Sequence, residues 1–135
     1  MRRASKKVAS QLRIIGGIWR GRKLRFPDRP GLRPTGDRVR ETLFNWLEPE
    51  LAGAHCLDLF AGSGALGIEA LSRGAAGCDF VDADREALAA VEQHLGTLGA
   101  SDRCTVRFGT AAEYLRTAQG GWDIVFVDPP FKAQL

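Results

Sequence analysis

An acid followed by two prolines and an aromatic residue, Asp128-Pro129-Pro130-Phe131, is the segment of this sequence best suited to chemistry. It follows an apolar run over residues 124–127, which is typical of a buried parallel strand. Consecutive prolines fix their own φ and lack N–H groups, so the backbone cannot continue a strand ladder there. The acid and the free carbonyls of this segment can accept hydrogen bonds from an exocyclic amine, and its aromatic ring can stack a planar base. The segment also lies where α/β folds bind ligands, at the carboxyl end of a strand.

A second candidate site is the glycine pattern Gly62-x-Gly64-x-x-Gly67, which follows the apolar segment 56–60. Glycines at this spacing join a strand to a helix and let the backbone approach a nucleotide closely. Asp82 ends the next apolar run, 20 residues beyond Gly62, which is the spacing at which an acid meets a ribose diol. Strand, turn, helix and acid occur together, so the sequence predicts a nucleoside-cofactor site.

The acid Asp58, four residues before Gly62, bears on which cofactor binds. Dinucleotide sites hold a pyrophosphate at the N-terminus of the helix, and a neighbouring carboxylate would repel that anion. S-adenosylmethionine instead carries a sulfonium and an amino group, which a carboxylate attracts. Asp58 therefore favours the methyl donor over NAD, although the same side chain could hold loop N–H groups in a purely structural role.

Strand and helix patterns alternate from residue 56 to the end of the sequence. We expect helices over residues 65–73, ended by Gly74, and over 84–95, capped by Asp84, and a short helix opened by the capping-box pair Thr110 and Glu113. Strands that alternate with helices predict a parallel sheet with right-handed crossovers, which is the α/β class. The expected strands cover residues 56–60, 78–81, 105–108 and 123–127.

Charge is distributed unevenly along the chain. Residues 1–40 hold thirteen Lys and Arg against two acids, a net charge of +11, whereas residues 41–135 hold six basic and fourteen acidic residues, a net charge of −8. Apolar residues interleave with the charges over residues 13–26, which predicts a basic hairpin with its turn near Arg20 to Arg22. Such a hairpin is suited to RNA or DNA, while a merely solubilising role is the alternative.

A helix should follow the Pro/Gly-rich connector 27–34. Thr35 or Asp37 can cap it, and its apolar face would carry Val39, Leu43, Trp46 and Leu47 at helical spacing. Arg38 and Arg40 fall in its first turn, where the helix dipole disfavours cations. A bound anion would offset that cost, and solvation by water is the simpler alternative.

Four motifs of this chain together resemble a known family. The catalytic and cofactor motifs are similar to those of class I amino-methyltransferases. The N-terminal motifs are Arg13-Ile-Ile-Gly-Gly-x-Trp19-Arg-Gly-Arg-Lys-Leu24 and Arg33-Pro-Thr-x-Asp-Arg-Val-Arg-Glu-Thr-Leu-Phe-Asn-Trp-Leu47. They resemble signatures of the bacterial methyltransferases that act on the N2 amine of a guanine in 16S ribosomal RNA. The resemblance covers residues 11–132. The long N-terminal motifs are more specific than the catalytic loop, which DNA adenine methyltransferases also use.

The resemblance implies a class I S-adenosylmethionine-dependent fold, a Rossmann-like parallel sheet preceded by a basic hairpin and helix. It implies a disordered basic tail over residues 1–12, an RNA-binding hairpin and helix over 13–50, and the first half of a methyltransferase domain over 51–135. Its partner would be 16S ribosomal RNA or the assembling small subunit. The implied catalytic residues are Asp128, Pro129, Pro130 and Phe131; the cofactor residues are Asp58, Phe60, Ala61, Gly62, Ser63, Gly64, Asp82, Ala83, Thr110 and Ala111; the RNA contacts are Arg13, Trp19, Arg20, Arg22, Lys23, Arg33, Arg38 and Arg40.

The chain departs from the family pattern in two ways. Thr110 stands where the family often has Asn or Asp before the alanine after the third strand, which puts the usual polar contact to the cofactor's adenine in doubt. The family sheet has seven strands, whereas this sequence stops just after the fourth, so we expect a truncated chain. An inactive remnant that keeps its RNA and cofactor sites, or an N6-adenine DNA methyltransferase, are the alternative functions.

Composition limits the remaining classes. The 44% apolar content is enough for a packed core, and no run is long enough to span a membrane. The basic start lacks the apolar stretch of a secretory signal. Cys56, Cys78 and Cys104 lack CxxC spacing, so we interpret them as reduced core residues of a cytoplasmic protein and expect no metal site.

Overall fold

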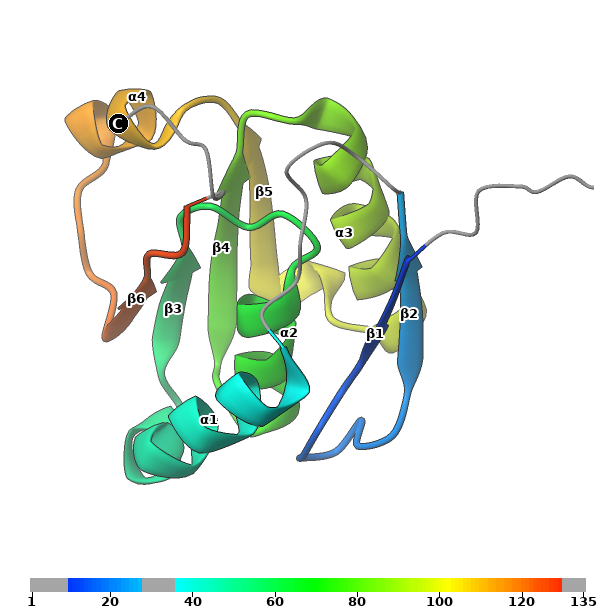
Figure 1. The fold of residues 1–135 in the computed structure, drawn as a ribbon. Coiled ribbons are helices and arrows are strands. Elements are labelled where there is room, and N and C mark those ends of the chain that lie inside the picture. Colours follow the sequence, from blue (N-terminus) through cyan, green and yellow to red (C-terminus); the bar gives the residue numbers. More distant parts are fainter. Residues whose placement is uncertain (1–9, 28–35, 130–135) are drawn as a thin grey trace, which may run out of the picture.

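The computed structural model describes residues 10–27 and 36–129. A four-stranded sheet with the order β5-β4-β3-β6 forms its centre, and a two-stranded hairpin lies beside it (Figure 1). No helix within these two ranges is long and apolar enough to cross a membrane. The elements are β1 Ser10–Arg13, β2 Lys23–Phe26, α1 Asp37–Leu51, β3 His55–Asp58, α2 Ala65–Ser72, β4 Gly77–Asp82, α3 Arg85–Leu98, the 3-10 turn η1 Ser101–Arg103, β5 Cys104–Phe108, α4 Ala111–Thr117 and β6 Ile124–Phe126.

The predicted parallel sheet is confirmed. β3 pairs in parallel with both β4 and β6, and β4 pairs in parallel with β5. The strands begin and end within two residues of the expected positions; β3 ends at Asp58 because the chain then enters the glycine loop. All four carboxyl ends meet at one edge of the sheet, which places the sequence motifs that follow them at that edge.

The two faces of the sheet are covered differently, because alternate residues of a strand point to opposite faces. The face that carries Cys56 and Phe80 packs against the hairpin, α1, α2 and α3 in one hydrophobic core. The other face, with Leu57 and Val81, is covered by a smaller cluster that includes Tyr114 of α4. The N-terminal segment and the sheet therefore share one core.

The predicted helix caps are confirmed at two helices. The side chain of Asp84 accepts hydrogen bonds from the N–H groups of Glu86 and Ala87 at the start of α3. Thr110 and Glu113 form the reciprocal capping box of α4. α3 runs three residues further than expected, to Leu98, and ends at Gly99, whose φ of 76° glycine adopts readily.

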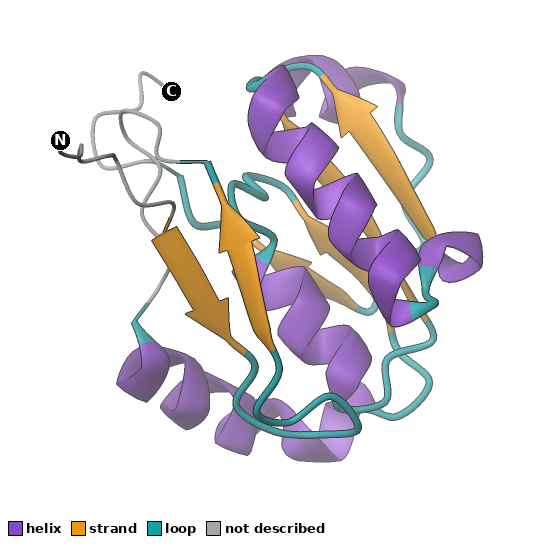
Figure 2. Cartoon of the chain, turned by 90° about the vertical axis from the view of Figure 1, so that its right-hand side faces the viewer, coloured by secondary structure: helices purple, strands orange, loops and turns teal. Residues whose placement is uncertain are grey.

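The hairpin is confirmed, but it starts earlier than predicted. β1 pairs with β2 in antiparallel register from Ser10 opposite Phe26 to Arg13 opposite Lys23 (Figure 2). The tail expected over residues 1–12 was therefore too long, because Leu12 is a buried strand residue that packs into the core. Residues 1–9 lie outside the described residues. The turn falls where expected, with Gly21 in a left-handed conformation.

The buried face of α1 agrees with the prediction at Leu43 and Leu47, which pack against the core, and differs from it at the other two positions. Val39 is 60% exposed and Trp46 is 78% exposed, whereas Arg40, Phe44 and Leu51 are buried. The side of α1 that faces the core therefore carries residues 40, 44, 47 and 51, which are spaced as one face of a helix. Because residue 40 is an arginine, the pattern of apolar residues in the sequence does not indicate this face. The N-cap is Gly36 and not Asp37, which is the first residue of the helix. The alternative cap, Thr35, lies outside the described residues.

The predicted burial of the cysteines is confirmed for two of the three. All three are free; Cys56 and Cys78 are buried, and Cys104 is half-buried. Burial, reinforced by the charges of Asp123 and Asp58, raises the pKa of the Cys56 thiol to about 11. The thiol therefore stays protonated at neutral pH and behaves as a small apolar side chain.

Candidate cofactor site and RNA-binding arm

The glycine loop between β3 and α2 forms a tight turn held by its own backbone. The N–H of Ala61 donates to the carbonyl of Val81 at 2.9 Å, and the N–H of Gly64 donates to the carbonyl of Ala61 at 2.7 Å. Gly62 and Gly64 have φ values of 53° and 82°, which β-branched residues resist. The turn therefore depends on glycine at both positions.

The third glycine of the pattern serves helix packing. A Cβ atom at Gly67 would lie 2.3 Å from Phe80 Cε1 and 2.8 Å from Cys78 Sγ. Any side chain there would push α2 away from β4. The first two glycines thus shape the turn and the third brings the helix onto the sheet, as in nucleotide-binding turns.

Asp82 lies at the end of β4 and links the loop to the start of α3. Its Oδ2 accepts from the N–H of Gly62 at 2.8 Å, and its Oδ1 accepts from the N–H of Asp84 at 2.9 Å. A carboxylate has about four acceptor positions, so further ones remain for hydroxyl groups. The side chain is half-buried at the carboxyl edge, where it could meet a ribose. Ala83, Thr110 and Ala111 follow the ends of β4 and β5 at the same edge.

Asp58 is buried beneath the loop and has the structural role that the sequence left open. It accepts a hydrogen bond from the N–H of Gly67 at 3.0 Å in the first turn of α2. Burial is the main cause that raises the pKa of this carboxyl to about 7; the Gly67 bond lowers the pKa, and the charges of Asp128 and Asp82 add to the rise. Three carboxyl groups thus converge at one edge, which makes the edge attractive to a cation.

The start of the predicted catalytic loop lies next to the cofactor loop. Asp58 of β3 is in register with Phe126 of β6, and the N–H of Leu59 donates to the carbonyl of Phe126 at 3.1 Å. Asp128 therefore emerges from the same edge as Asp58, close enough to affect its ionisation. Asp128 is exposed and Pro129 is half-buried. Pro130 and Phe131 lie outside the described residues.

The outer face of the hairpin carries the predicted basic arm. Buried and exposed residues alternate along β2, and Lys23 and Arg25 point outward. Arg13 stands directly opposite Lys23 in the register, and like charges in this position repel. Arg20 and Arg22 extend the exposed charge around the turn, and Arg38 is exposed on α1. This arm, defined as residues 10–26, therefore presents a cationic surface. Arg33 lies outside the described residues.

Two of the predicted RNA contacts are wrong. Trp19 is only 7% exposed because its side chain packs into the core, so it offers no ring for stacking. Arg40 is 1% exposed and forms ion pairs with Asp37 at 2.7 Å and with Glu69 at 3.2 Å. Its charge is neutralised inside the protein, which also answers the question of which anion offsets the dipole at the start of α1.

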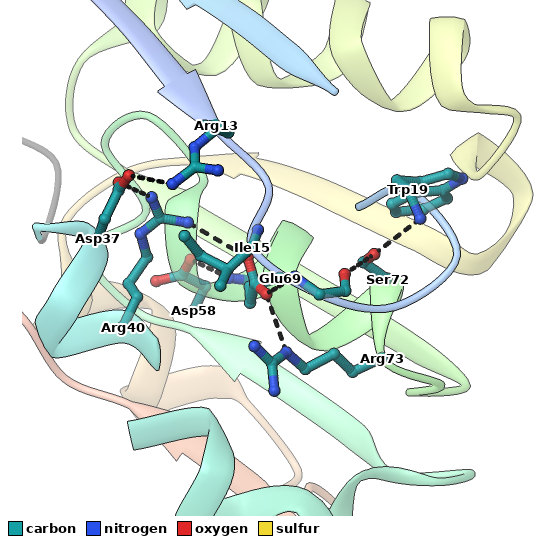
Figure 3. A network of polar contacts seen from close by, with 11 residues as sticks. Arg13, Ile15, Trp19, Asp37, Arg40, Asp58, Glu69, Ser72 and Arg73 are labelled. Atoms are coloured by element: carbon teal, nitrogen blue, oxygen red, sulfur yellow. Dashed lines mark hydrogen bonds and ion pairs between the residues drawn. The ribbon is translucent and has the colours of Figure 1, made fainter. Parts of the chain in front are cut away.

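The residue that sequence reasoning missed is Glu69 of α2. It is fully buried, and it accepts hydrogen bonds from the hairpin, from α1 and from its own helix (Figure 3). An acid inside an otherwise apolar helical segment, residues 65–71, was the signal that could have revealed it. Acids are almost never fully buried unless they are paired, so this one required basic partners.

Comparisons with known proteins place the chain in a family. A family model described as conserved hypothetical protein 95 matches residues 12–135. Ribosomal RNA small subunit methyltransferase D of Escherichia coli is 53% identical over 135 residues, which are 100% of this chain and 68% of that protein. This chain belongs to the ribosomal RNA small subunit methyltransferase D family. The Haemophilus influenzae member is 47% identical over 128 residues, 93% of this chain and 66% of that protein.

Solved structures agree with the methyltransferase D assignment. The structure of Escherichia coli yhhF, described as a methyltransferase, superposes with a TM-score of 0.84 at 55% identity, over 93% of this chain and 68% of that chain. The fold is therefore that of a methyltransferase, as the sequence predicted, and the chain is a member of an enzyme family. In this methyltransferase D chain the hydroxyl of Thr110, at the position of the family's polar residue, caps α4 by accepting from the N–H of Glu113.

Proposed function

We propose that this chain carries the cofactor site and catalytic loop of an enzyme that transfers a methyl group from S-adenosylmethionine to the N2 amine of a guanine in 16S ribosomal RNA. The observation that carries the proposal is the register of β3 with β6, which sets Asp128 beside the glycine loop. A target amine held at Asp128 would lie next to a cofactor held by that loop. The methyltransferase D relatives support ribosomal RNA as the substrate class.

The cofactor would be held across the carboxyl edge of the sheet. The loop residues Phe60, Ala61, Gly62, Ser63 and Gly64 would face it, and Asp82 would accept hydrogen bonds from the ribose hydroxyls. Ala83, Thr110 and Ala111 would border the adenine. The convergence of Asp58, Asp82 and Asp128 supports a cationic ligand over a pyrophosphate. When bound, S-adenosylmethionine supplies an electrophilic methyl group on its sulfonium.

The chain's own contribution to the reaction would be positioning. The Asp128 carboxylate and the Pro129 carbonyl would accept hydrogen bonds from the guanine amine and orient its lone pair, and Phe131 would stack the base. Orientation of this kind lowers a barrier without a covalent enzyme intermediate. The base would have to leave its stack to reach the edge, as in other enzymes that modify bases.

The arm would bind RNA through its phosphates. Arg13, Arg20, Arg22, Lys23 and Arg25 share the exposed side of the hairpin. Arg13 is also paired with Asp37 at 3.2 Å, so part of its charge is already compensated within the protein. Phosphate contacts position a nucleic acid without reading its sequence, so the arm would dock the RNA and the catalytic edge would select the base.

A methyl-transfer assay tests this proposal against its alternatives. Tritiated methyl donor is incubated with small-subunit RNA or with naked DNA, using this chain and a chain continued past Leu135 to the length of the relatives, called the extended chain below. We expect label in small-subunit RNA with the extended chain, and none when Asp128 is replaced by Ala. Label in DNA alone would identify an adenine DNA methyltransferase, and no label with either substrate would identify a remnant.

A further inference from the structure

Glu69 joins three separate elements through one buried carboxylate. Its Oε1 accepts from the N–H of Ile15 at 3.0 Å and from Nη1 of Arg40 at 3.2 Å. Its Oε2 accepts from the N–H of Gly16 at 2.9 Å and from Nε of Arg73 at 2.9 Å. Each oxygen therefore takes one backbone N–H of the arm and one guanidinium group, and the side chain is 0% exposed (Figure 3).

A second set of contacts holds the turn of the arm against the same helix. Ser72 Oγ donates to the carbonyl of Gly16 at 2.6 Å and accepts from the N–H of Trp19 at 3.0 Å. The Ser72 carbonyl accepts from the N–H of Ile18 at 2.8 Å. A Cβ at Gly17 would lie 1.9 Å from that carbonyl oxygen. The arm is thus attached through its backbone, which fixes its orientation independently of its charged side chains.

The helix that holds the arm also carries the cofactor loop. α2 begins immediately after Gly64, and Asp58 of β3 fixes its first turn at Gly67. Glu69 follows two residues later and Ser72 ends the helix. With a rise of about 1.5 Å per residue, the loop and the arm contacts are separated by roughly 10 Å of helix. No flexible segment intervenes between them.

We propose that Glu69 is a positioning residue for RNA methylation: it fixes the cationic arm and α1 at one distance and angle from the cofactor loop, and it touches neither RNA nor cofactor. The inference rests on the proposed function. It also explains why Arg40, which sequence analysis placed among the RNA contacts, is buried: Arg40 fixes α1 to the same carboxylate.

Directionality distinguishes this arrangement from ordinary packing. Buried ion pairs are costly to desolvate, and apolar residues of similar size often stabilise a fold equally well. Four hydrogen bonds to two oxygens, however, fix an orientation that apolar contacts leave adjustable. In an enzyme that must present a base to a methyl group, a misplacement of about 1 Å can cost on the order of 100-fold in rate. Orientation is therefore what the buried carboxylate contributes.

The replacement Glu69→Gln in the extended chain tests the proposal. The amide keeps the size of the side chain but removes its charge and one acceptor oxygen. We expect the KM for small-subunit RNA to rise at least about tenfold, which corresponds to a loss of about 1.4 kcal/mol in the free energy of RNA binding. Affinity for S-adenosylhomocysteine, measured by calorimetry, should stay within about threefold. The amides of Ile15 and Gly16 should exchange with deuterium faster.

Glu48→Gln is the matched control. Glu48 pairs with the same Arg73, at 3.3 Å, but its side chain is exposed, whereas that of Glu69 is buried. It should leave both the RNA KM and cofactor affinity unchanged. An unchanged RNA KM in Glu69→Gln, with an active wild-type enzyme, would overturn the inference alone; an inactive wild-type enzyme would overturn the proposed function instead.

A second variant covers the case in which Glu69→Gln does not fold. Replacing Arg40, Glu69 and Arg73 together by Leu removes the buried carboxylate with both of its guanidinium partners and fills the space with apolar atoms, which restores stability in a comparable buried Arg–Glu–Arg group. The arm would still lack its carboxylate acceptor, so we expect a folded enzyme with normal cofactor affinity and a raised RNA KM. A triple variant that methylates RNA with the wild-type KM would contradict the positioning role.

Discussion

Asp82 and Asp58 both place a carboxyl group at the carboxyl edge of the sheet, but the two groups differ in burial and in their contacts. Asp82 is half-buried and accepts hydrogen bonds from two backbone N–H groups. Asp58 is buried against α2, and burial raises its pKa to about 7. The sequence predicted that both would lie in this site, but the difference between them arises from depth, which residue spacing does not encode.

The raised pKa of Asp58 predicts a pH-dependent stability. The folded protein holds a proton on this group between about pH 4 and 7, where the unfolded chain has released it, so stability must fall as pH rises through that window. Asp58→Asn keeps an acceptor for Gly67 and removes the titration. We expect urea unfolding to show that the wild type loses, relative to this variant, a few kcal/mol between pH 4 and 7. Parallel pH profiles for the two proteins would contradict the assigned burial.

Gly62 provides a second prediction at the scale of one residue. A β-branched residue at position 62 would be strained at the φ of 53° that Gly62 adopts. The backbone would move to relieve this strain and would displace the N–H group that donates to Asp82. We expect Gly62→Val to lose binding of S-adenosylhomocysteine in calorimetry. Gly96→Ala is the control, since its Cβ would meet only Ser101 Oγ at 3.8 Å within a helix. Wild-type affinity in Gly62→Val would show that the loop does not hold the cofactor.

At the scale of elements, local signals were sufficient for the sheet and its helices. Alternating patterns, the Asp84 cap and the Thr110–Glu113 capping box all act within a few residues, and each was found where predicted. The orientation of α1 was not predictable, because it depends on Glu69, which lies 29 residues from Arg40 in the sequence. Phe44 turns inward with Arg40 and packs against Phe126 of β6, with ring centroids 5.6 Å apart. Long-range ion pairs overrode the hydrophobic pattern of this helix.

The exposed charges of the arm are expected to determine its affinity for RNA. Reversing Arg20 and Arg22 to Glu changes the exposed turn of the hairpin without touching its buried side. We expect weaker binding to small-subunit RNA and a shallower dependence of affinity on salt, because fewer counterions are released. Cofactor affinity should be unchanged. Reversing Arg107 and Arg116, which are exposed on β5 and α4, gives a control of equal charge; equal losses in the two variants would mean that net charge alone matters.

At the scale of the molecule, the outermost strand on one lateral side of the sheet is short and apolar, and this lateral edge is distinct from the carboxyl edge described above. β6 pairs with β3, and no other described strand lies beyond it. Val125 is 45% exposed and Val127 is 62% exposed. Unpaired apolar edges recruit strands from other chains. The chain spans 68% of the length of the Escherichia coli relative.

This edge predicts self-association of the 135-residue chain. We expect light scattering to show oligomers or aggregates, with no measurable methyl transfer, although the catalytic and cofactor motifs are present. Val125→Lys places a charge on the edge and should reduce association without altering the core. A monodisperse monomer of the unaltered chain would contradict the prediction.

Nucleoside analysis of methylated RNA tests the central claim most directly. The extended chain, purified small-subunit RNA and S-adenosylmethionine are incubated together, the RNA is digested, and the nucleosides are identified by mass spectrometry. The account predicts N2-methylguanosine with the wild type and its absence with Asp128→Ala, which removes the carboxylate proposed to hold the guanine amine. A methylated adenine, a methyl group on another atom of guanine, or equal product from both proteins would contradict the account.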